Sequence, residues 1–307
     1  MVMIMENVKI SKVCGICAGC NYAIQTAQQK IDEGKQVVLF KEIVHNPHVN
    51  NNFANKGVCI ANNLSDLKAN NHVIIRAHGE PPETYEYLTN NNISFSDCTC
   101  VNVKNIHKKV NSFSKSGYTI IIIGKYGKAN GKPHPETVGT IGWCKNEPIL
   151  IEDMDDLYKL NFNQPAKYYL VCQTTFNEQK ADEIIEHATK LCNANNRELI
   201  INKSICSAQK NINRFSVELA KSCDIMVVVG GKKSSNSLEL FNNVKNYTNA
   251  IFIEEINDWY DEIKNKSFEF NATTKVGLTA GASTPKDELF ELKKLIENKQ
   301  KELSLWK

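Results

Sequence analysis

Three cysteines are the residues of this chain best placed to do chemistry. Cys17, Cys100 and Cys206 each follow a strand-like run and precede a helix-like one. Thiols that share this position at the carboxyl ends of parallel strands can meet at one point and bind a metal or a cluster. An iron–sulfur cubane held by only three cysteines keeps one iron with an open coordination position. Because thiols also fill ordinary cores, the spacing leaves a metal site and a structural role equally open.

A second arrangement competes for the first of these thiols. Cys14, Cys17 and Cys20 form C-x2-C-x2-C, which is the opening of a bacterial ferredoxin motif. The fourth cysteine of that motif is absent, because Ile24 stands at its position and no proline follows. A cluster bound by these three residues is therefore the second interpretation.

Three of the seven histidines lie where functional groups tend to lie. His45, His78 and His134 follow apolar runs or sit in turns beside Gly and Pro, and together they indicate an anion pocket. His134 and Glu136 flank a proline, and this stiff turn presents an imidazole and a carboxyl group near one another. Such a pair suits proton delivery.

Hydroxyl and amide side chains follow three further apolar runs. Ser234, Ser235 and Asn236 follow DIMVVV, Ser283 follows KVGL, and Thr174 follows KYYLV. Each set stands before a helix-like segment, where it can cap the helix or help its N-terminal amides to bind phosphate. The chain contains few arginines and neither the P-loop nor the G-x-G-x-x-G motif. A bound diphosphate would therefore rely on neutral donors, histidines and helix dipoles.

The elements that position these residues alternate between short apolar runs and longer amphipathic stretches. This β–α rhythm is typical of an α/β fold with mainly parallel sheets. We predict three similar α/β units, 1–99 carrying Cys17, 100–205 carrying Cys100 and 206–307 carrying Cys206. The strand-like runs are VVLF, HVIIRA, TIIIIG, KYYLVC, ELIIN, DIMVVVGG, AIFIEE and KVGLTAGA.

Composition excludes several classes of protein. With 307 residues, 42% hydrophobic and 23% charged, the chain is long enough and apolar enough to fold on its own core. A net charge of +3 is too small to indicate nucleic acid or an anionic membrane as a partner. The longest apolar run falls far short of a membrane helix. Eleven cysteines without a signal-like start indicate a reducing compartment.

Taken together, these segments resemble the 4-hydroxy-3-methylbut-2-enyl diphosphate reductases, the IspH/LytB family. The matching segments occur in the family's order over nearly the whole chain; they are GICAGCNYAI, EIVHN, AHG, DCTC, HPETVGT, QTT, KSSNS and TAGAS. The resemblance implies three α/β units arranged as a trefoil around a central [4Fe-4S] cluster. The chain departs from the family pattern beside Cys100 and in the SAQKNIN segment after Cys206.

The resemblance also implies roles for individual residues. Cys17, Cys100 and Cys206 match the cluster ligands, and Glu136 matches the proton donor. Thr174 matches the threonine that orients the substrate hydroxyl and Glu136. The residues that match the diphosphate-binding set are His45, His78, His134, Ser234, Ser235, Asn236 and Ser283.

The implied reaction is a reductive dehydroxylation of the allylic alcohol diphosphate to isopentenyl and dimethylallyl diphosphates. It is the last step of the non-mevalonate isoprenoid pathway, and it consumes two electrons and two protons and releases water. Because the sequence has no flavin or nicotinamide motif, an external carrier of the ferredoxin or flavodoxin type is implied. The compartment is a bacterial cytoplasm, or a plastid or apicoplast if a transit peptide has been removed.

Two other functions remain as alternatives. The first is an iron–sulfur redox sensor or electron carrier without catalysis, which would use Cys14, Cys17 and Cys20. The second is a zinc hydrolase that uses His134 and Glu136, although the close His-x-x-x-His spacing of such enzymes is missing.

Overall fold

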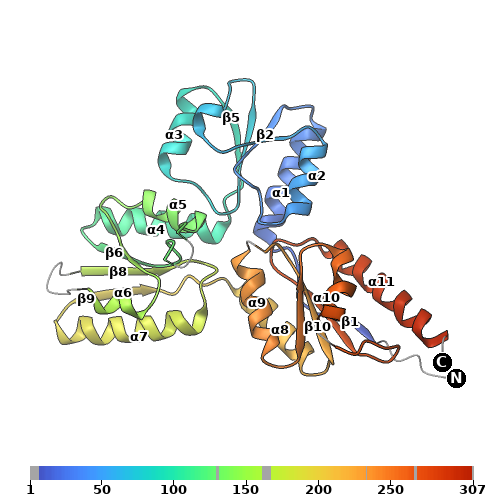
Figure 1. Cartoon of the computed structure of the whole chain (residues 1–307). Coiled ribbons are helices and arrows are strands. Elements are labelled where there is room, and N and C mark those ends of the chain that lie inside the picture. The colour runs from blue at the N-terminus through green and yellow to red at the C-terminus, as the bar shows by residue number, and fades with distance from the viewer. Residues whose placement is uncertain (1–6, 129–130, 161–166, 233, 266–267, 306–307) are drawn as a thin grey trace. The chain divides into compact units, whose positions relative to one another are not determined.

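The chain divides into two units. The computed structural model describes residues 7–128, 131–160, 167–232, 234–265 and 268–305 (Figure 1). Unit 1 contains the described residues of Met1–Asn21, Val44–Gly57 and Ser207–Lys307, and unit 2 contains those of Tyr22–Ile43 and Val58–Cys206.

Unit 1 is built on one four-stranded parallel sheet, sheet A, in the order β1-β12-β10-β11. Its strands are β1 (Val8–Ile10), β10 (Ile225–Val229), β11 (Asn249–Ile253) and β12 (Val276–Ala280). The helices that belong wholly to this unit are α2 (Pro47–Asn55), α8 (Ser207–Ala220), α9 (Ser235–Lys245), α10 (Trp259–Asn265) and α11 (Lys286–Leu305).

Unit 2 holds two further four-stranded sheets, and both are parallel throughout. Sheet B has the order β3-β2-β4-β5, from β2 (Val37–Phe40), β3 (Cys59–Ala61), β4 (His72–Ile75) and β5 (Ser94–Asp97). Sheet C has the order β7-β6-β8-β9, from β6 (Thr119–Ile123), β7 (Ile149–Ile151), β8 (Lys167–Cys172) and β9 (Glu198–Asn202). The accompanying helices are α3 (Pro82–Asn90), α4 (Val101–Lys115), α5 (Pro135–Gly142), α6 (Met154–Tyr158) and α7 (Glu178–Ala194), and α1 (Ala18–Asp32) runs from unit 1 into unit 2.

The predicted fold class is confirmed, because all three sheets are parallel and alternate with helices. The central strands β10 and β12 are buried along their whole length, as strands covered on both faces must be. All eight predicted strand-like runs form strands. Each of the three cysteines singled out by the sequence immediately precedes a helix, namely α1, α4 and α8.

One strand differs from the predicted division into 1–99, 100–205 and 206–307. Residues of β1 fall in the first predicted unit, but this strand pairs with β12, with Val8 opposite Val276. Its short run VKI carries no sign of its partner, which follows more than 250 residues later in the chain. The three-way boundaries themselves stay a prediction.

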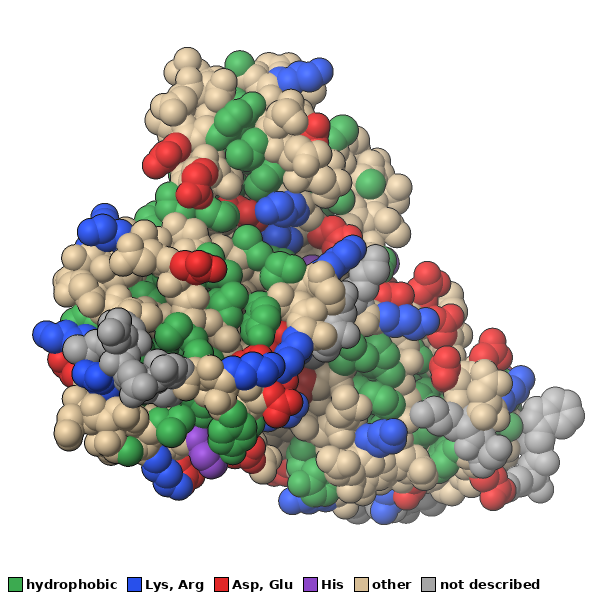
Figure 2. Space-filling model, turned by 60° about the vertical axis from the view of Figure 1, so that its left-hand side comes forward, with side chains coloured by type: hydrophobic (Ala, Val, Ile, Leu, Met, Phe, Trp, Pro, Cys, Tyr) green, Lys and Arg blue, Asp and Glu red, His purple; other side chains and the backbone are tan. Residues whose placement is uncertain are grey.

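The face of the molecule seen in Figure 2 carries charged side chains of both signs. Figure 2 shows Lys and Arg side chains interspersed with Asp and Glu on the visible face, as a net charge of +3 leads one to expect. In the part of the chain that the structure describes, no helix is both long and apolar enough to cross a bilayer.

Candidate active site

The centre of the candidate site in unit 2 is a buried carboxyl group that one residue holds by both oxygens. Glu136 lies in the first turn of α5 and is only 1% exposed. Its Oε1 accepts a hydrogen bond from the Thr174 backbone N–H at 2.6 Å, and its Oε2 accepts one from the Thr174 hydroxyl at 2.6 Å. Thr174 lies in the loop that follows the buried end of β8. The loop after β8 and the first turn of α5 therefore position Thr174 and Glu136, respectively.

Burial changes the acidity of this carboxyl group. Loss of water raises the pKa of Glu136 to about 7, although the two hydrogen bonds from Thr174 act in the opposite direction. The group therefore exchanges a proton near neutral pH, which is the property that a proton donor needs.

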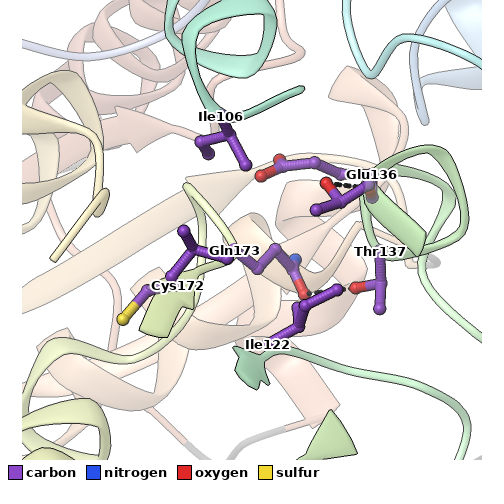
Figure 3. A pocket seen from close by; sticks show the side chains of 8 residues that line it. Ile106, Ile122, Glu136, Thr137, Cys172 and Gln173 are labelled. Atoms are coloured by element: carbon purple, nitrogen blue, oxygen red, sulfur yellow. Dashed lines mark hydrogen bonds between the residues drawn. The ribbon is translucent and has the colours of Figure 1, made fainter. Parts of the chain in front are cut away.

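The surroundings explain why the carboxyl group is dry. Figure 3 shows Glu136 beside Ile106, in a pocket that Ile122 and Gln173 also line and that has no room for a water molecule. Gln173 fixes the loop after β8, because its Oε1 accepts from the Lys125 N–H at 2.9 Å and its Nε2 donates to Thr175 Oγ1 at 2.7 Å. The sequence analysis includes Gln173 in the matching segment QTT but assigns it no role; that segment and its position next to the end of a strand were the signals that could have indicated one.

His134 caps the helix that carries Glu136. Its Nδ1 accepts a hydrogen bond from the Glu136 backbone N–H at 3.2 Å, so in the neutral ring the proton resides on Nε2. The predicted pairing of this imidazole with the neighbouring carboxyl group is thus made through the backbone, while the carboxyl group bonds to Thr174. The two residues still lie at one helix start, as the His-Pro-Glu turn predicts.

A second imidazole lies against the first. The rings of His78 and His134 are edge to face, with centroids 5.2 Å apart, and both side chains are half-buried. His78 reaches this place because the next residue is Gly79, whose φ of +72° favours glycine. A Cβ there would lie 2.7 Å from His107 Cε1 and 2.8 Å from Thr99 Cγ2, so only glycine fits.

Two of the predicted cluster ligands are tied to the same loops of unit 2. The Cys206 backbone N–H donates to the Thr174 carbonyl at 2.8 Å, and the Cys100 backbone N–H donates to the Ala77 carbonyl at 3.0 Å. The Asn102 amide donates to Cys206 Sγ at 3.6 Å. Both cysteines are half-buried and immediately precede a helix.

The third predicted ligand, Cys17, lies in unit 1 at the start of α1. Hydrogen bonds from the Cys20 thiol and from nearby backbone amides lower the pKa of Cys17 to about 6, against the effect of burial. Its own backbone N–H donates to the Ala282 carbonyl at 3.1 Å. The Cys17 thiol is therefore more acidic than the Cys14 thiol, whose pKa is raised by burial.

Cys14, which belongs to the alternative cluster site with Cys17 and Cys20, has a hydrogen-bond partner of its own. The Cys14 thiol is buried, donates to the Ser11 carbonyl at 3.2 Å, and has its pKa raised by burial. Within either unit, the described residues contain no three His, Cys, Asp or Glu side chains arranged to hold a metal ion.

The predicted diphosphate-binding residues of unit 1 lie on the loops that follow β10 and β12, together with His45. Ser234 caps α9, where its Oγ accepts from the Ser237 N–H at 3.4 Å. The side chain of Ser235 lies outside the described part of the chain. A Cβ on Gly231 would lie 2.3 Å from the His45 carbonyl oxygen, so this glycine lets the His45 segment approach the turn before Ser234.

Two atoms of this set point to a ligand. The buried oxygens Asn236 Oδ1 and Ser283 Oγ have no hydrogen-bond partner among the described residues. A buried polar atom without a partner destabilises the fold by about 1–3 kcal/mol, so such atoms normally form a hydrogen bond with protein, water or a ligand. A phosphate ester would accept a hydrogen bond from the Ser283 hydroxyl group, and from the Asn236 amide N–H when that side chain turns it toward the ligand.

Comparison with known proteins identifies the family. The model of the family described as "LytB protein" matches residues 8–297. The chain belongs to the LytB family. The resemblance recognised from the sequence motifs is therefore confirmed, and membership implies an iron–sulfur cluster.

The similar proteins are named as diphosphate reductases. The chain is 31% identical over 293 residues, 95% of its length and 99% of the other, to the 4-hydroxy-3-methylbut-2-enyl diphosphate reductase of Clostridioides difficile (strain 630). It is 33% identical to the protein of that name from Thermoanaerobacter sp. (strain X514), over 91% of this chain and 92% of the other. It is also similar to the solved structure of the E-1-hydroxy-2-methyl-but-2-enyl-4-diphosphate reductase from Plasmodium falciparum. That match has a TM-score of 0.80 and 28% identity, over 94% of this chain and 87% of the other.

Proposed function

We propose that this protein reduces 4-hydroxy-3-methylbut-2-enyl diphosphate to isopentenyl diphosphate and dimethylallyl diphosphate, the last step of the non-mevalonate isoprenoid pathway. The observation that carries the proposal is the Glu136 carboxyl group, dry, held by Thr174 through both oxygens and with a pKa of about 7. A carboxyl group of this kind donates a proton to a leaving hydroxyl group. Family membership supplies the reaction class.

The residues present fit an iron–sulfur cluster. Cys17, Cys100 and Cys206 each precede a helix and are half-buried, so each can be a thiolate and still be reached by a ligand. The low pKa of Cys17 supports the same role. We propose that these three residues hold a [4Fe-4S] cluster, which when bound supplies electrons and an iron with an open coordination position.

The chain's own groups then bind, orient and protonate. Glu136 protonates the hydroxyl group of the substrate as its C–O bond breaks, and the oxygen leaves as water. Thr174 keeps the carboxyl group in one orientation through its N–H and its hydroxyl group. Two electrons and a second proton complete the reduction of the allyl fragment. Both electrons come from an external one-electron carrier of the ferredoxin or flavodoxin type.

The diphosphate is bound by neutral donors and imidazoles. The oxygens of Asn236 and Ser283 are buried and have no partner among the described residues, so their polar groups are available to a ligand. We propose that the binding set consists of His45, His78, His134, Ser234, Ser235, Asn236 and Ser283. Holding the diphosphate in this way fixes the position of the hydroxyl group, and positioning contributes much of the rate in reactions of this kind.

The decisive experiment measures iron and sulfide in protein purified without oxygen. Cys17→Ser, Cys100→Ser and Cys206→Ser should each lose most of the cluster, while Cys14→Ser, the matched control, should retain it because its thiol is already bonded to the Ser11 carbonyl. Wild-type protein with a strong reductant should consume the allylic diphosphate.

Two results would contradict the proposal. Retention of iron in Cys100→Ser and Cys206→Ser, with loss in Cys14→Ser, would support the carrier that uses Cys14, Cys17 and Cys20. Zinc without sulfide in the wild-type protein would favour the hydrolase instead.

A further inference from the structure

The first two turns of α8 bury polar groups that the fold leaves without partners. Gln209 is only 7% exposed, and neither its Nε2 nor its Oε1 has a hydrogen-bond partner among the described residues. Asn213, one turn later on the same face, has a buried Oδ1 in the same condition. Gln300 shows the ordinary arrangement: it is 6% exposed, and its Nε2 donates to the Thr274 carbonyl at 2.7 Å.

Packing within unit 1 shows where Gln209 lies. α8 ends at Ala220 and leads into β10, so it runs antiparallel to the strands of sheet A and begins at their carboxyl ends. The Ser216 hydroxyl group bonds to Thr279 Oγ1 of β12 at 2.6 Å, which shows that this stripe of the helix faces the sheet. Gln209 is on the same stripe two turns earlier, about 10 Å further along the helix axis.

That distance carries Gln209 beyond the end of β12. The strand ends at Ala280, one residue after Thr279, and Ser283 lies in the turn that follows. α8 also packs against α9, whose first turn holds Asn236. Unpartnered atoms of Gln209, Asn236 and Ser283 therefore stand at the same edge of sheet A, on three different elements of unit 1.

One ligand can account for the unpartnered polar groups of Gln209, Asn236 and Ser283 together. A buried amide with no partner destabilises a fold, and an apolar side chain of similar size would remove that penalty. Several such groups at one strand-end edge indicate that a polar ligand completes their hydrogen bonds. Neither helix has a charged residue in its first turn that could replace the donors, apart from Lys210 of α8, which has other interactions.

We propose that Gln209 is a further ligand-binding residue, whose side-chain N–H group donates to a diphosphate oxygen of the substrate. Asn213 lies one turn after Gln209 on the same face of α8 and adds a second amide side chain to that face. The inference rests on the proposed function, since the diphosphate is that of the proposed substrate. It adds a neutral amide donor to a site in a chain with only three arginines.

The test compares two buried glutamines in the cluster-containing protein. Binding of inorganic pyrophosphate and of isopentenyl diphosphate is measured by calorimetry for the wild type, Gln209→Leu and the matched control Gln300→Leu. Gln209→Leu should weaken binding of both compounds about 10-fold or more, because a hydrogen bond to a charged group is lost. Its melting temperature without ligand should equal or exceed that of the wild type, since the buried amide had no partner.

Gln300→Leu should behave in the opposite way. Removal of its bond to the Thr274 carbonyl should lower the melting temperature and leave diphosphate binding unchanged. Gln209→Glu, which keeps the size but adds a negative charge, should weaken binding more than Gln209→Leu does. In steady-state assays of Gln209→Leu, KM should rise with little change in kcat.

The outcomes separate this inference from the proposed function. If the wild type binds both compounds and Gln209→Leu binds them equally well, the inference is wrong and the proposed function stands. If Gln209→Leu melts well below the wild type or does not fold, the amide is structural and the inference is overturned. If the wild type binds neither compound, both proposals fail.

Discussion

Replacing Glu136 by Gln should remove a pH dependence from the stability of this protein. The pKa of this carboxyl group is raised from 4.5 to about 7, because burial penalises its charged form. A raised carboxyl pKa means that the folded state holds the proton more tightly than the unfolded state. The resulting stability is fully present below pH 4.5 and is lost as the pH rises through 7.

The size of the effect follows from the shift. It corresponds to about 3 kcal/mol of unfolding free energy between the protonated and the ionised protein. Gln is neutral at every pH and lacks this term. Its amide meets the Thr174 N–H less well than a carboxylate oxygen does, but that loss of about 1–3 kcal/mol is the same at all pH values. The pH dependence of the difference between the two proteins is therefore diagnostic.

The assay is urea unfolding of the wild type and Glu136→Gln at pH 5 and pH 8. Relative to the variant, the wild type should be less stable at pH 8 than at pH 5 by about 2.5 kcal/mol, because part of the effect is already lost at pH 5. Glu183→Gln, an exposed carboxyl group of the same unit, is the control and should show no such change. A difference that is the same at both pH values would refute the argument that burial controls this group. Turnover should nearly vanish in Glu136→Gln while the cluster and substrate binding remain, and normal turnover would exclude Glu136 as the proton donor.

Three further predictions concern the same site. Thr174→Val removes a hydrogen bond that lowers the pKa of Glu136, so the alkaline limb of the pH–rate profile should move to higher pH, and an unmoved limb would contradict the assignment. Gly79→Ala should lower the unfolding free energy by at least about 1 kcal/mol, because φ is +72° and the new Cβ would clash with His107 and Thr99. Urea unfolding measures this change, and a midpoint equal to that of the wild type would contradict the prediction. In cluster-free protein, iodoacetamide at pH 7 should label Cys17 faster than Cys14, because the pKa of Cys17 is about 6 and that of Cys14 is raised; equal rates by mass spectrometry would overturn this.

The parts of the fold that the sequence predicted well are the buried central strands. Strands such as β6 and β10 are covered on both faces, so they appear as continuous runs of Ile and Val. The strands that sequence reasoning missed are β1, β3, β5 and β7, and each is an edge strand of three or four residues with partly exposed side chains. These strands are too short for a pattern of hydrophobic residues to mark them, whereas the five-residue edge strands β9 and β11 were predicted.

The site divides in the same way. Residues with chemistry of their own, such as Cys206 and Glu136, were found because their types stand out after a strand. No role was assigned to Gln209 or Gln173, because the role of a buried amide depends on the groups that surround it in the folded protein. The partner of a side chain, or the lack of one, is set by tertiary contacts such as the one between Ser216 and Thr279, which lie 63 residues apart.

Thr174 shows how a single residue can set both the position and the acidity of a proton donor. Its backbone N–H and its hydroxyl group hold the two oxygens of Glu136, while its carbonyl oxygen accepts the backbone N–H of Cys206. Two of these three bonds use the main chain, so a substitution at this position leaves them available. The side chain adds the one bond that mutation removes, and that bond lowers the pKa of the carboxyl group. Variants at Thr174 should therefore alter the pH at which the donor works more than they alter its position.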